Sequence, residues 1–310
     1  MNDDTIPIIG LVLHFRTPEK TLACLRSQQD EGIRQAVVID NSEDDGQSIS
    51  AMQDELDDLR SAGFGVEILS PGRNLGFAIG VNKGLEYIAA KQRSHVLLIN
   101  SDARLTSGAL THMRRALAPS VIVAPFLAQG THPPASPIAY YDRLLGLITR
   151  SPQLMPLRHA SGCCLLIHAC QIHSPLFDQD FFFYGDDVML GFTSKQRHLI
   201  ECECPQAVIA HATSSSAKNG SMFYEYHLNR AHWLLACKLA RNPLERSAFI
   251  AARCVTLPLR ILVRSLRSRS LFAFRGFLAA TADVLRGRCR SFTPPATKTE
   301  TNSFHRDGQT

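Results

Sequence analysis

Two adjacent acids, Asp186 and Asp187, directly follow four aromatic residues and a glycine. A carboxylate held beside apolar rings loses hydration, so its pKa rises and it becomes a better proton acceptor near neutral pH. A third acid, Asp102, ends a run that begins at His95 and reads as a buried strand. Together the acids suggest a sugar-transfer site. In such a site one carboxylate holds a metal-bound diphosphate, and another activates a hydroxyl group. In the alternative interpretation, all three are solvated loop residues.

The elements that must position these acids alternate along the first 125 residues. Short apolar runs predict buried strands, with helices between them. Strands are expected at residues 8–13, 36–39, 66–69, 96–99 and 121–123, and helices from residue 17 and at 48–61, 76–90 and 106–117. Such an alternation predicts an α/β fold with a mainly parallel central sheet and helices on both faces. The polar residues at 14–17, 40–42 and 100–102 then share one crevice beyond the carboxyl ends of the strands.

Beyond residue 125 the alternation weakens. Residues 128–158 are rich in proline, histidine and polar residues, which predicts a mobile loop over the site and a place for acceptor selection. Strands at 163–167 and 207–210 and a helix at 224–239 follow. Residues 291–310 read as a disordered tail.

The composition is that of a globular protein, and 310 residues suffice for one large α/β domain or two smaller ones. Nine cysteines with irregular spacing favour buried reduced thiols in a cytosolic protein over a zinc site or a disulfide framework. The N-terminus lacks the basic and apolar regions of a signal peptide, and no apolar run is long enough to cross a bilayer. The chain is therefore expected in the cytoplasm.

The net charge of +5 hides an asymmetry, because residues 241–290 contain eleven arginines and only two acids. Leucines and phenylalanines are interleaved with the arginines, a composition that suits amphipathic helices on anionic headgroups. Pro258 is expected to break one of these helices. We expect peripheral contact with the cytoplasmic face of a membrane. The alternatives are helices packed on the catalytic domain with a solvated basic face, or nucleic-acid binding, for which no motif is present.

Five segments, in order along the chain, carry a resemblance to a known family. They are VIDNS ending at Ser42, NLGFAIGVNKG beginning at Asn74, LINSD ending at Asp102, the pair Ser161-Gly162, and FD followed by FFYGDD ending at Asp187. In these segments the chain resembles bacterial family 2 glycosyltransferases of the GT-A fold, within them the rhamnosyltransferase-like branch that builds surface polysaccharides. The similarity covers residues 7–290 and implies a nucleotide-diphospho-sugar donor and a glycan or lipid-linked acceptor.

Several residues are expected to bind the donor. Asp40 stands at a strand end, where its carboxylate could accept a hydrogen bond from the imide N–H of uracil or thymine; a simple turn is the alternative. Small residues within 72–84 allow the backbone to approach a ligand closely, although a plain helix with glycines fits them too. The expected donor-binding residues are His14, Arg16, Asp40, Asn41, Arg73, Asn74, Gly76, Phe77, Asn82, Asn100 and Ser101.

Asp102 is the best candidate metal ligand, because Mg²⁺ and Mn²⁺ prefer oxygen and are often held by one or two carboxylates plus substrate phosphates. In the family, a histidine at the position of His211 completes the metal site or touches the diphosphate. Asp187 matches the family's catalytic base, and Asp186 replaces the usual glutamate before it. An inverting transfer needs only a base to deprotonate the acceptor hydroxyl, without a covalent enzyme nucleophile. Because adjacent carboxylates can share a proton, either acid could titrate as the base.

Two departures from the family pattern concern the acceptor. Met189 stands where the family often has a second acid, and Leu228 stands where it often has arginine. Neither removes the expected base or metal ligand. Two rival functions stay open: a nucleotidyltransferase on a related sheet, although residues 14–17 are not a glycine-rich phosphate loop, and a non-catalytic glycan- or membrane-binding component of a polysaccharide assembly complex.

The expected organisation has three parts. Residues 1–240 form the GT-A catalytic domain, residues 241–290 a basic amphipathic helical extension, and residues 291–310 the tail.

Overall fold

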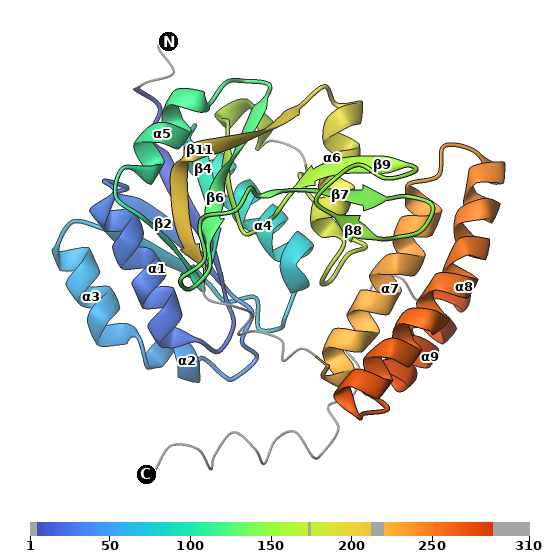
Figure 1. Cartoon of the computed structure of the whole chain (residues 1–310). Coiled ribbons are helices and arrows are strands. Elements are labelled where there is room, and N and C mark those ends of the chain that lie inside the picture. Colours follow the sequence, from blue (N-terminus) through green and yellow to red (C-terminus); the bar gives the residue numbers. More distant parts are fainter. Residues whose placement is uncertain (1–4, 173–174, 212–219, 288–310) are drawn as a thin grey trace.

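The apolar runs of the first hundred residues form four parallel strands. They are β1 (Ile8–His14), β2 (Gln35–Asp40), β3 (Gly65–Leu69) and β4 (His95–Asn100). The computed structural model describes residues 5–172, 175–211 and 220–287, so the expected tail at 291–310 lies outside the described residues. The four strands belong to an eight-stranded sheet with the order β3-β2-β1-β4-β10-β6-β11-β5 (Figure 1).

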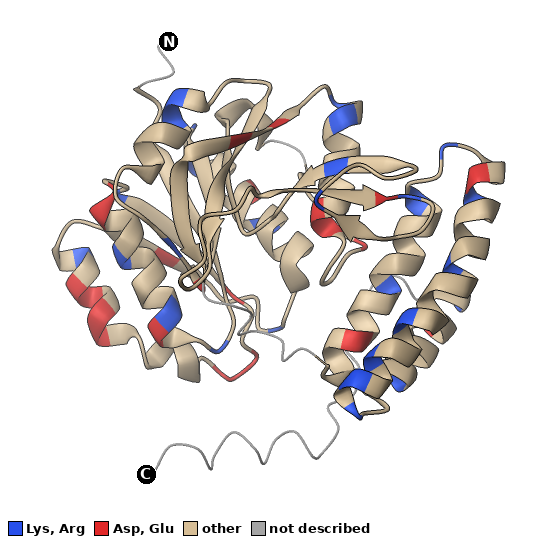
Figure 2. Cartoon of the chain, viewed as in Figure 1, with Lys and Arg blue, Asp and Glu red and all other residues tan. Residues whose placement is uncertain are grey.

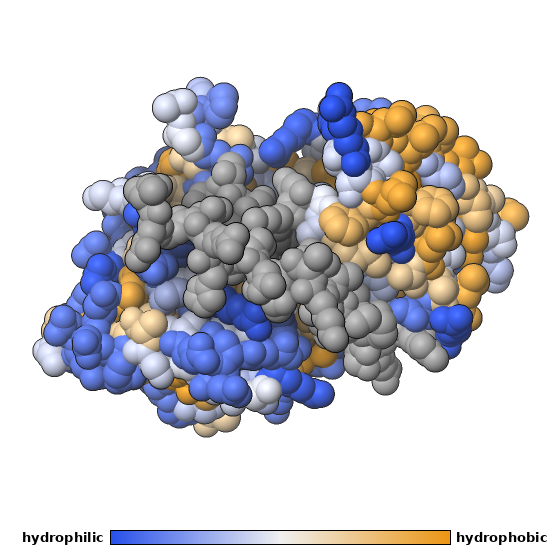
Figure 3. Space-filling view, turned by 90° about the horizontal axis from the view of Figure 1, so that it is seen from below, coloured by the Kyte–Doolittle hydropathy of each residue, from blue (hydrophilic) through white to orange (hydrophobic). Residues whose placement is uncertain are grey.

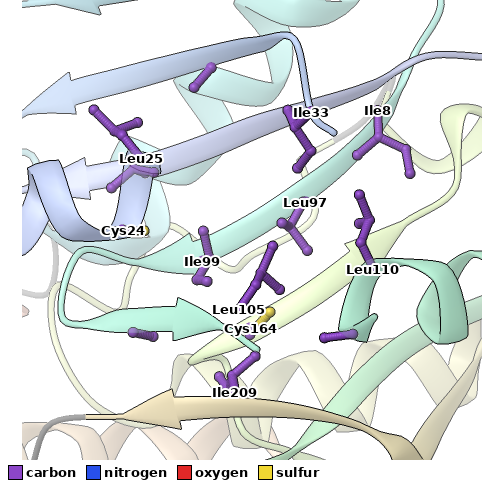
Figure 4. Packing of buried hydrophobic residues seen from close by; sticks show 14 of the residues in the cluster. Ile8, Cys24, Leu25, Ile33, Leu97, Ile99, Leu105, Leu110, Cys164 and Ile209 are labelled. Atoms are coloured by element: carbon purple, nitrogen blue, oxygen red, sulfur yellow. The ribbon is translucent and has the colours of Figure 1, made fainter. Parts of the chain in front are cut away.

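Successive side chains of these strands point to opposite faces, so each face of the sheet has its own apolar core. Val12 and Leu97 belong to one core, whereas Leu11 and Leu98 belong to the other. Figure 4 shows part of the first core. The first core is covered by α1 (Pro18–Asp30), α3 (Gln53–Ser61) and α5 (Ala109–Ala116), and the second by α4 (Gly76–Lys91). The helix expected at 48–61 is divided into α2 (Gln47–Ser50) and α3.

The second half of the sheet mixes strand directions. It contains β5 (Ala103–Leu105), β6 (Val121–Ala128), β10 (Cys164–Ile167) and β11 (Ile200–His211). β10 runs antiparallel between β4 and β6, whereas β6 and β11 are parallel. The three-residue strand β5, which the sequence did not indicate, pairs antiparallel with β11 at the edge of the sheet.

The mobile loop expected at 128–158 is wrong, because this segment folds into most of a second sheet. That sheet has the order β8-β7-β9 and consists of β7 (Ile138–Asp142), β8 (Ile148–Thr149) and β9 (Pro156–Ala160). Buried Asp142 organises its turns, since its carboxylate accepts hydrogen bonds from the backbone N–H groups of Leu145 and Met155. Such side-chain contacts across a turn are not visible as hydrophobic periodicity.

Helices complete the chain. α6 (Asp186–Gln196) follows the aromatic segment and the short turn η2 (Ala169–Gln171), while α7 (Met222–Lys238), α8 (Pro243–Ser268) and α9 (Phe272–Leu285) lie side by side at one end of the molecule (Figure 1). The helix break expected at Pro258 is wrong, because α8 continues through it. Cys254, four residues earlier, is exposed, so the carbonyl that proline leaves without a donor can turn to water.

The eight cysteines in the described part of the chain are all free. Cys24, Cys163, Cys164 and Cys204 are buried, as expected, whereas Cys170 and Cys254 are exposed. Burial raises the pKa of Cys24 to about 12, so that thiol stays protonated near neutral pH.

Candidate active site

A tight reversal of the backbone delivers the two adjacent acids. Tyr184 (φ 64°) and Gly185 (φ 80°) both adopt the left-handed conformation, and α6 begins directly after them. Asp186 and Asp187 therefore occupy the first turn of α6. The free N–H groups and the positive end of the helix dipole favour negative charge at this position.

Asp187 faces a pocket. Its side chain is 30% exposed, its Oδ1 accepts a hydrogen bond of 2.7 Å from the Val188 N–H, and its Oδ2 lies 3.6 Å from Nδ1 of His159. The pocket has a volume of ≈ 280 Å³ and is lined by Leu127, Pro137, Ala139, Ile148, Thr149, Arg150, His159, Ser161 and Asp187. A carboxylate with access to such a pocket can reach a bound hydroxyl group.

Asp186 is buried behind its neighbour. Loss of hydration, and then repulsion from the charge of Asp187, raise the pKa of Asp186 to about 8. At neutral pH the Asp186 carboxyl is consequently mainly protonated. Asp187 is the member of the pair whose side chain is accessible from the pocket.

Two further polar residues, which the sequence interpretation missed, surround Asp187. Buried His159 lies on β9, and a Cβ on Gly191 would lie 2.7 Å from a His159 atom, so α6 passes very close to β9. Buried Glu201 accepts a 2.6 Å hydrogen bond from the Ala160 N–H, and burial raises its pKa to about 7. In sequence, Leu157 and Ala160 flank two polar residues without a clear strand period, and the segment lies between the loop expected at 128–158 and the strand expected at 163–167.

Asp102 and His211 come together through the short strand β5. His211 is paired with Ala103, the residue after Asp102, so the antiparallel ladder places the two side chains together. Asp102 Oδ1 lies 3.4 Å from His211 Nε2, and both side chains are largely buried. On its other side, His211 Nδ1 lies 3.5 Å from the Gln129 amide nitrogen.

One turn, residues 161–163, borders both groups of acids. The Asn100 N–H donates a 2.9 Å hydrogen bond to the Cys163 carbonyl, and burial together with the charge of Asp102 raises the pKa of Cys163. A Cβ on Gly162 would lie 3.7 Å from Asp186 Oδ2. The acids at 102 and at 186–187, distant in sequence, therefore both lie near the same turn.

Among the expected donor-binding residues, Asp40 and Asn41 stand at the end of β2. Asp40 Oδ1 accepts a 3.0 Å hydrogen bond from the Ser42 N–H, the contact expected of an aspartate in a simple turn. Its Oδ2 lies 3.5 Å from the Ser70 hydroxyl. The Asn41 amide donates to the Gly76 carbonyl and accepts from the Leu75 N–H. Asn41 is thus engaged in holding the start of α4.

The glycine-rich segment connects α4 to the aromatic segment. Gly76 has φ 71°, and a Cβ there would lie 2.5 Å from the Phe182 carbonyl oxygen. That oxygen accepts a 2.9 Å hydrogen bond from the Phe77 N–H, and the Phe77 ring packs edge-on against Phe177. Asn74 accepts a 2.9 Å hydrogen bond from the Gly76 N–H. Position 76 therefore requires glycine for two reasons: the positive φ of its backbone and the close contact with Phe182.

Two other expected donor ligands are occupied by protein partners. The Asn82 amide donates to the Phe177 carbonyl and accepts from the Leu176 and Phe177 N–H groups. Buried His14 has its ring nitrogens 2.7 Å from the Thr21 hydroxyl and 2.9 Å from the Ser48 hydroxyl. Both side chains position backbone around the crevice.

The remaining candidates differ in exposure. Arg16 is exposed and donates to the carbonyls of Ser42 and Glu43, and Arg73 is also exposed. Asn100 is half-buried and Ser101 is buried, both at the carboxyl end of β4.

The described residues contain no group of three or more histidine, cysteine or acidic side chains that could enclose a metal ion. The Asp102–His211 pair offers one oxygen and one nitrogen ligand 3.4 Å apart. This donor set fits Mg²⁺ or Mn²⁺ of the kind that takes its remaining ligands from substrate phosphates and water.

No protein-family model matches the chain, and no curated protein matches its sequence. Solved structures do resemble it. GalNAc-T7, crystallised with UDP, GalNAc and Mn²⁺, superposes with a TM-score of 0.58 at 12% identity over 76% of this chain and 50% of its own, so the chain spans half of that protein's length. A mannosyltransferase from Pyrobaculum calidifontis, in complex with GDP-Man and Mn²⁺, gives a TM-score of 0.52 at 12% identity over 91% of this chain and 88% of its own.

These similarities establish the fold. The central sheet, the helices on both faces and the order of the elements are those of the GT-A glycosyltransferase fold, as the sequence motifs implied. The C-terminal helices α8 and α9 extend beyond the central sheet (Figure 1).

Proposed function

We propose that the chain is an inverting, metal-assisted glycosyltransferase that moves a sugar from a nucleotide-diphospho-sugar to a glycan or lipid-linked acceptor in cell-surface polysaccharide synthesis. The observation that carries this proposal is the accessible carboxylate of Asp187 in its pocket, beside the turn that also borders Asp102. The motif resemblance favours family 2, its rhamnosyltransferase-like branch, and deoxythymidine-diphosphate-rhamnose as the leading donor.

Asp187 is the proposed catalytic base. Its carboxylate accepts the proton of the acceptor hydroxyl while that oxygen forms a bond to the anomeric carbon. The bond from the anomeric carbon to the diphosphate breaks on the opposite face, and the nucleoside diphosphate leaves with the electron pair. Asp186, with its pKa raised to about 8, remains protonated at neutral pH and can donate a hydrogen bond to Asp187 or to the acceptor.

Asp102 and His211 are the proposed metal ligands, for Mg²⁺ or Mn²⁺. When bound, such an ion would neutralise negative charge on the departing diphosphate. Two structures with the same fold contain Mn²⁺ together with a nucleotide or nucleotide sugar, which supports this part of the proposal.

The donor is proposed to lie along the carboxyl ends of β1, β2 and β4. Asp40, Arg73, Asn100 and Ser101 are the proposed direct contacts, with Arg16 at the rim. We assign positioning roles to His14, Asn41, Asn74, Gly76, Phe77 and Asn82, whose contacts within the protein are described above. Residues 1–240 are the proposed catalytic domain and residues 241–290 its helical extension, close to the inner leaflet of the membrane.

A thermal-shift screen of nucleoside diphosphates and their sugars, with and without Mg²⁺ or Mn²⁺, tests the proposal. A ligand that binds only the folded state raises the unfolding temperature by mass action. We expect one nucleotide sugar to give a metal-dependent shift that Asp102→Ala abolishes and Asp58→Ala, a change at an exposed acid on α3, preserves. A shift with nucleoside triphosphates alone, accompanied by pyrophosphate release, would instead identify a nucleotidyltransferase.

A further inference from the structure

In helix α8 the usual arrangement of an amphipathic helix is reversed. Arginines occupy the face that packs on the protein. Arg253 is fully buried and donates hydrogen bonds to the carbonyls of Leu144 and Arg143 and to the Tyr141 hydroxyl. Arg260 donates a 2.7 Å hydrogen bond to the Gly146 carbonyl. These contacts tie α8 to the turn between β7 and β8.

The opposite face of α8 is apolar and exposed. It carries Val255, Leu259, Leu262, Val263 and Leu266, each 57–70% exposed. Their spacing of four, seven, eight and eleven residues from the first places all five on one side of a helix. We call these residues, together with Leu271, Phe274 and Leu278, the docking face.

The docking face concentrates apolar exposure at one end of the molecule. Of the fourteen exposed large hydrophobic residues in the described part of the chain, ten lie between Leu244 and Leu285. Figure 3 shows hydrophobic residues gathered over the end of the molecule that contains these helices. Exposed apolar residues gathered at one end of a protein mark an interaction site.

The charge around this face determines what can cover it. Arg267, Arg269 and Arg275 are exposed between and beside its apolar residues, and residues 246–282 contain no acid. Figure 2 shows basic residues along α8, whereas acids gather on α3 at the far end. Two copies of the face would bring like charges together, which disfavours self-association. An anionic surface with an apolar interior complements both features.

We propose that the docking face binds an anionic lipid bilayer, with the leucines and Phe274 at the level of the upper acyl chains and the arginines among the headgroup phosphates. Among the described residues, no helix is long and apolar enough to pass through a bilayer, so α8 and α9 would lie in the plane of its surface. This inference gives the proposed peripheral location a defined surface, and it does not depend on the transfer reaction.

The same contacts connect the membrane to the pocket. Arg253 and Arg260 hold the turn at residues 143–146, and Ile148, Thr149 and Arg150, which follow this turn, line the pocket that contains Asp187. Docking of α8 therefore holds the Asp187 pocket in one orientation relative to the bilayer. That orientation suits an acceptor whose apolar anchor stays in the membrane.

Co-sedimentation of the full chain with vesicles tests the proposal. We expect binding to phosphatidylcholine vesicles that contain phosphatidylglycerol and little binding to phosphatidylcholine alone. The double variant Leu262→Ser/Leu266→Ser should weaken binding by about tenfold or more, and Arg267→Gln/Arg269→Gln should weaken it most at low salt. Ile200→Ser, at a 59% exposed residue on β11, and Arg93→Gln, at an exposed residue, are the matched controls and should bind as the wild type does.

All substituted side chains are exposed, so the unfolding temperatures of the variants should match that of the wild type. Phe274→Ser, on α9, is an independent variant of the docking face. Nucleotide-sugar binding by the variants should be retained, which separates failure of this inference from failure of the proposed function. Equal vesicle binding by wild type and leucine variant would overturn the proposal. A wild-type dimer that the leucine variant dissociates, with no vesicle binding, would assign the face to a second copy instead.

Discussion

Nδ1 of His159 lies 3.6 Å from Oδ2 of Asp187, and neither ring nitrogen of this buried histidine has a hydrogen-bond partner within the described structure. A buried polar group without a partner is costly, so a modest approach of the two side chains would be favourable. At this distance the His159 ring can orient the Asp187 carboxylate. We infer that His159 fixes the rotamer of the proposed base.

Replacement of His159 tests this positioning role. His159→Phe should lower kcat by about 10- to 100-fold, because loss of an orienting partner reduces but does not remove general-base catalysis. The KM for the donor should change little, and the pH dependence of kcat should shift. An unchanged pH profile together with a lowered unfolding temperature would instead indicate a purely structural role.

The raised pKa of Asp186 predicts a pH-dependent stability. Between the ordinary carboxyl pKa of about 4 and the folded-state value of about 8, the folded state holds a proton that the unfolded state has released. The free energy of unfolding should therefore fall as the pH rises through this window. Asp186→Asn should flatten the dependence and stabilise the protein at pH 8 by at least about 1 kcal/mol. Urea unfolding at several pH values measures the free energy of unfolding and its pH dependence. Asp58→Asn is the control. A steeper pH dependence in Asp186→Asn would contradict the raised pKa of Asp186.

Gly76 and Gly72 form a matched pair that separates backbone strain from steric conflict. Both have φ near 70°, but a Cβ at Gly76 would lie 2.5 Å from the Phe182 carbonyl oxygen, whereas a Cβ at Gly72 has no neighbour within 4 Å. Gly72→Ala should cost about 1 kcal/mol, and Gly76→Ala about 2–4 kcal/mol, in the free energy of unfolding. Equal costs would show that the α4 start is free to move away from Phe182.

Arg253 should hold α8 on the turn between β7 and β8. Arg253→Leu leaves the buried Arg143 carbonyl and the partly buried Leu144 carbonyl without their donor, so it should destabilise the protein by about 2–4 kcal/mol. Arg246→Leu changes an exposed arginine of the same helix and should have little effect. Denaturant unfolding compares the two, and similar free energies would contradict the packing role.

The sequence predicted the parts of the fold that depend on local pattern. Apolar runs such as Ile8–Leu13 are long enough to identify buried strands, and the GT-A fold followed from ordered motifs. β5 was missed because it is three residues long and pairs with a strand distant in sequence. β7–β9 pair with one another, but they lie in a segment rich in proline and polar residues whose turns are held by the Asp142 carboxylate. The same limit applies to His159, whose relation to Asp187 depends on the packing of α6 against β9.

The sequence also did not show which partners the polar side chains contact. Asn41 and Asn82 stand in motifs that suggested ligand contact, yet their amides bind backbone groups of neighbouring segments. An asparagine serves either purpose equally well, and only the tertiary structure distinguishes them. The same is true of the arginines of α8, whose sequence composition indicates a basic helix but not that Arg253 and Arg260 face inward.

The central claim is that Asp187 deprotonates the acceptor of a sugar transfer. Its most direct test is the rate of nucleoside diphosphate release from the donor identified by thermal shift, measured with a membrane-extracted glycolipid acceptor for the wild type and Asp187→Asn. The account predicts turnover by the wild type and a loss of at least about 100-fold in the variant, with the donor-induced thermal shift preserved. Equal turnover by the two proteins would contradict it.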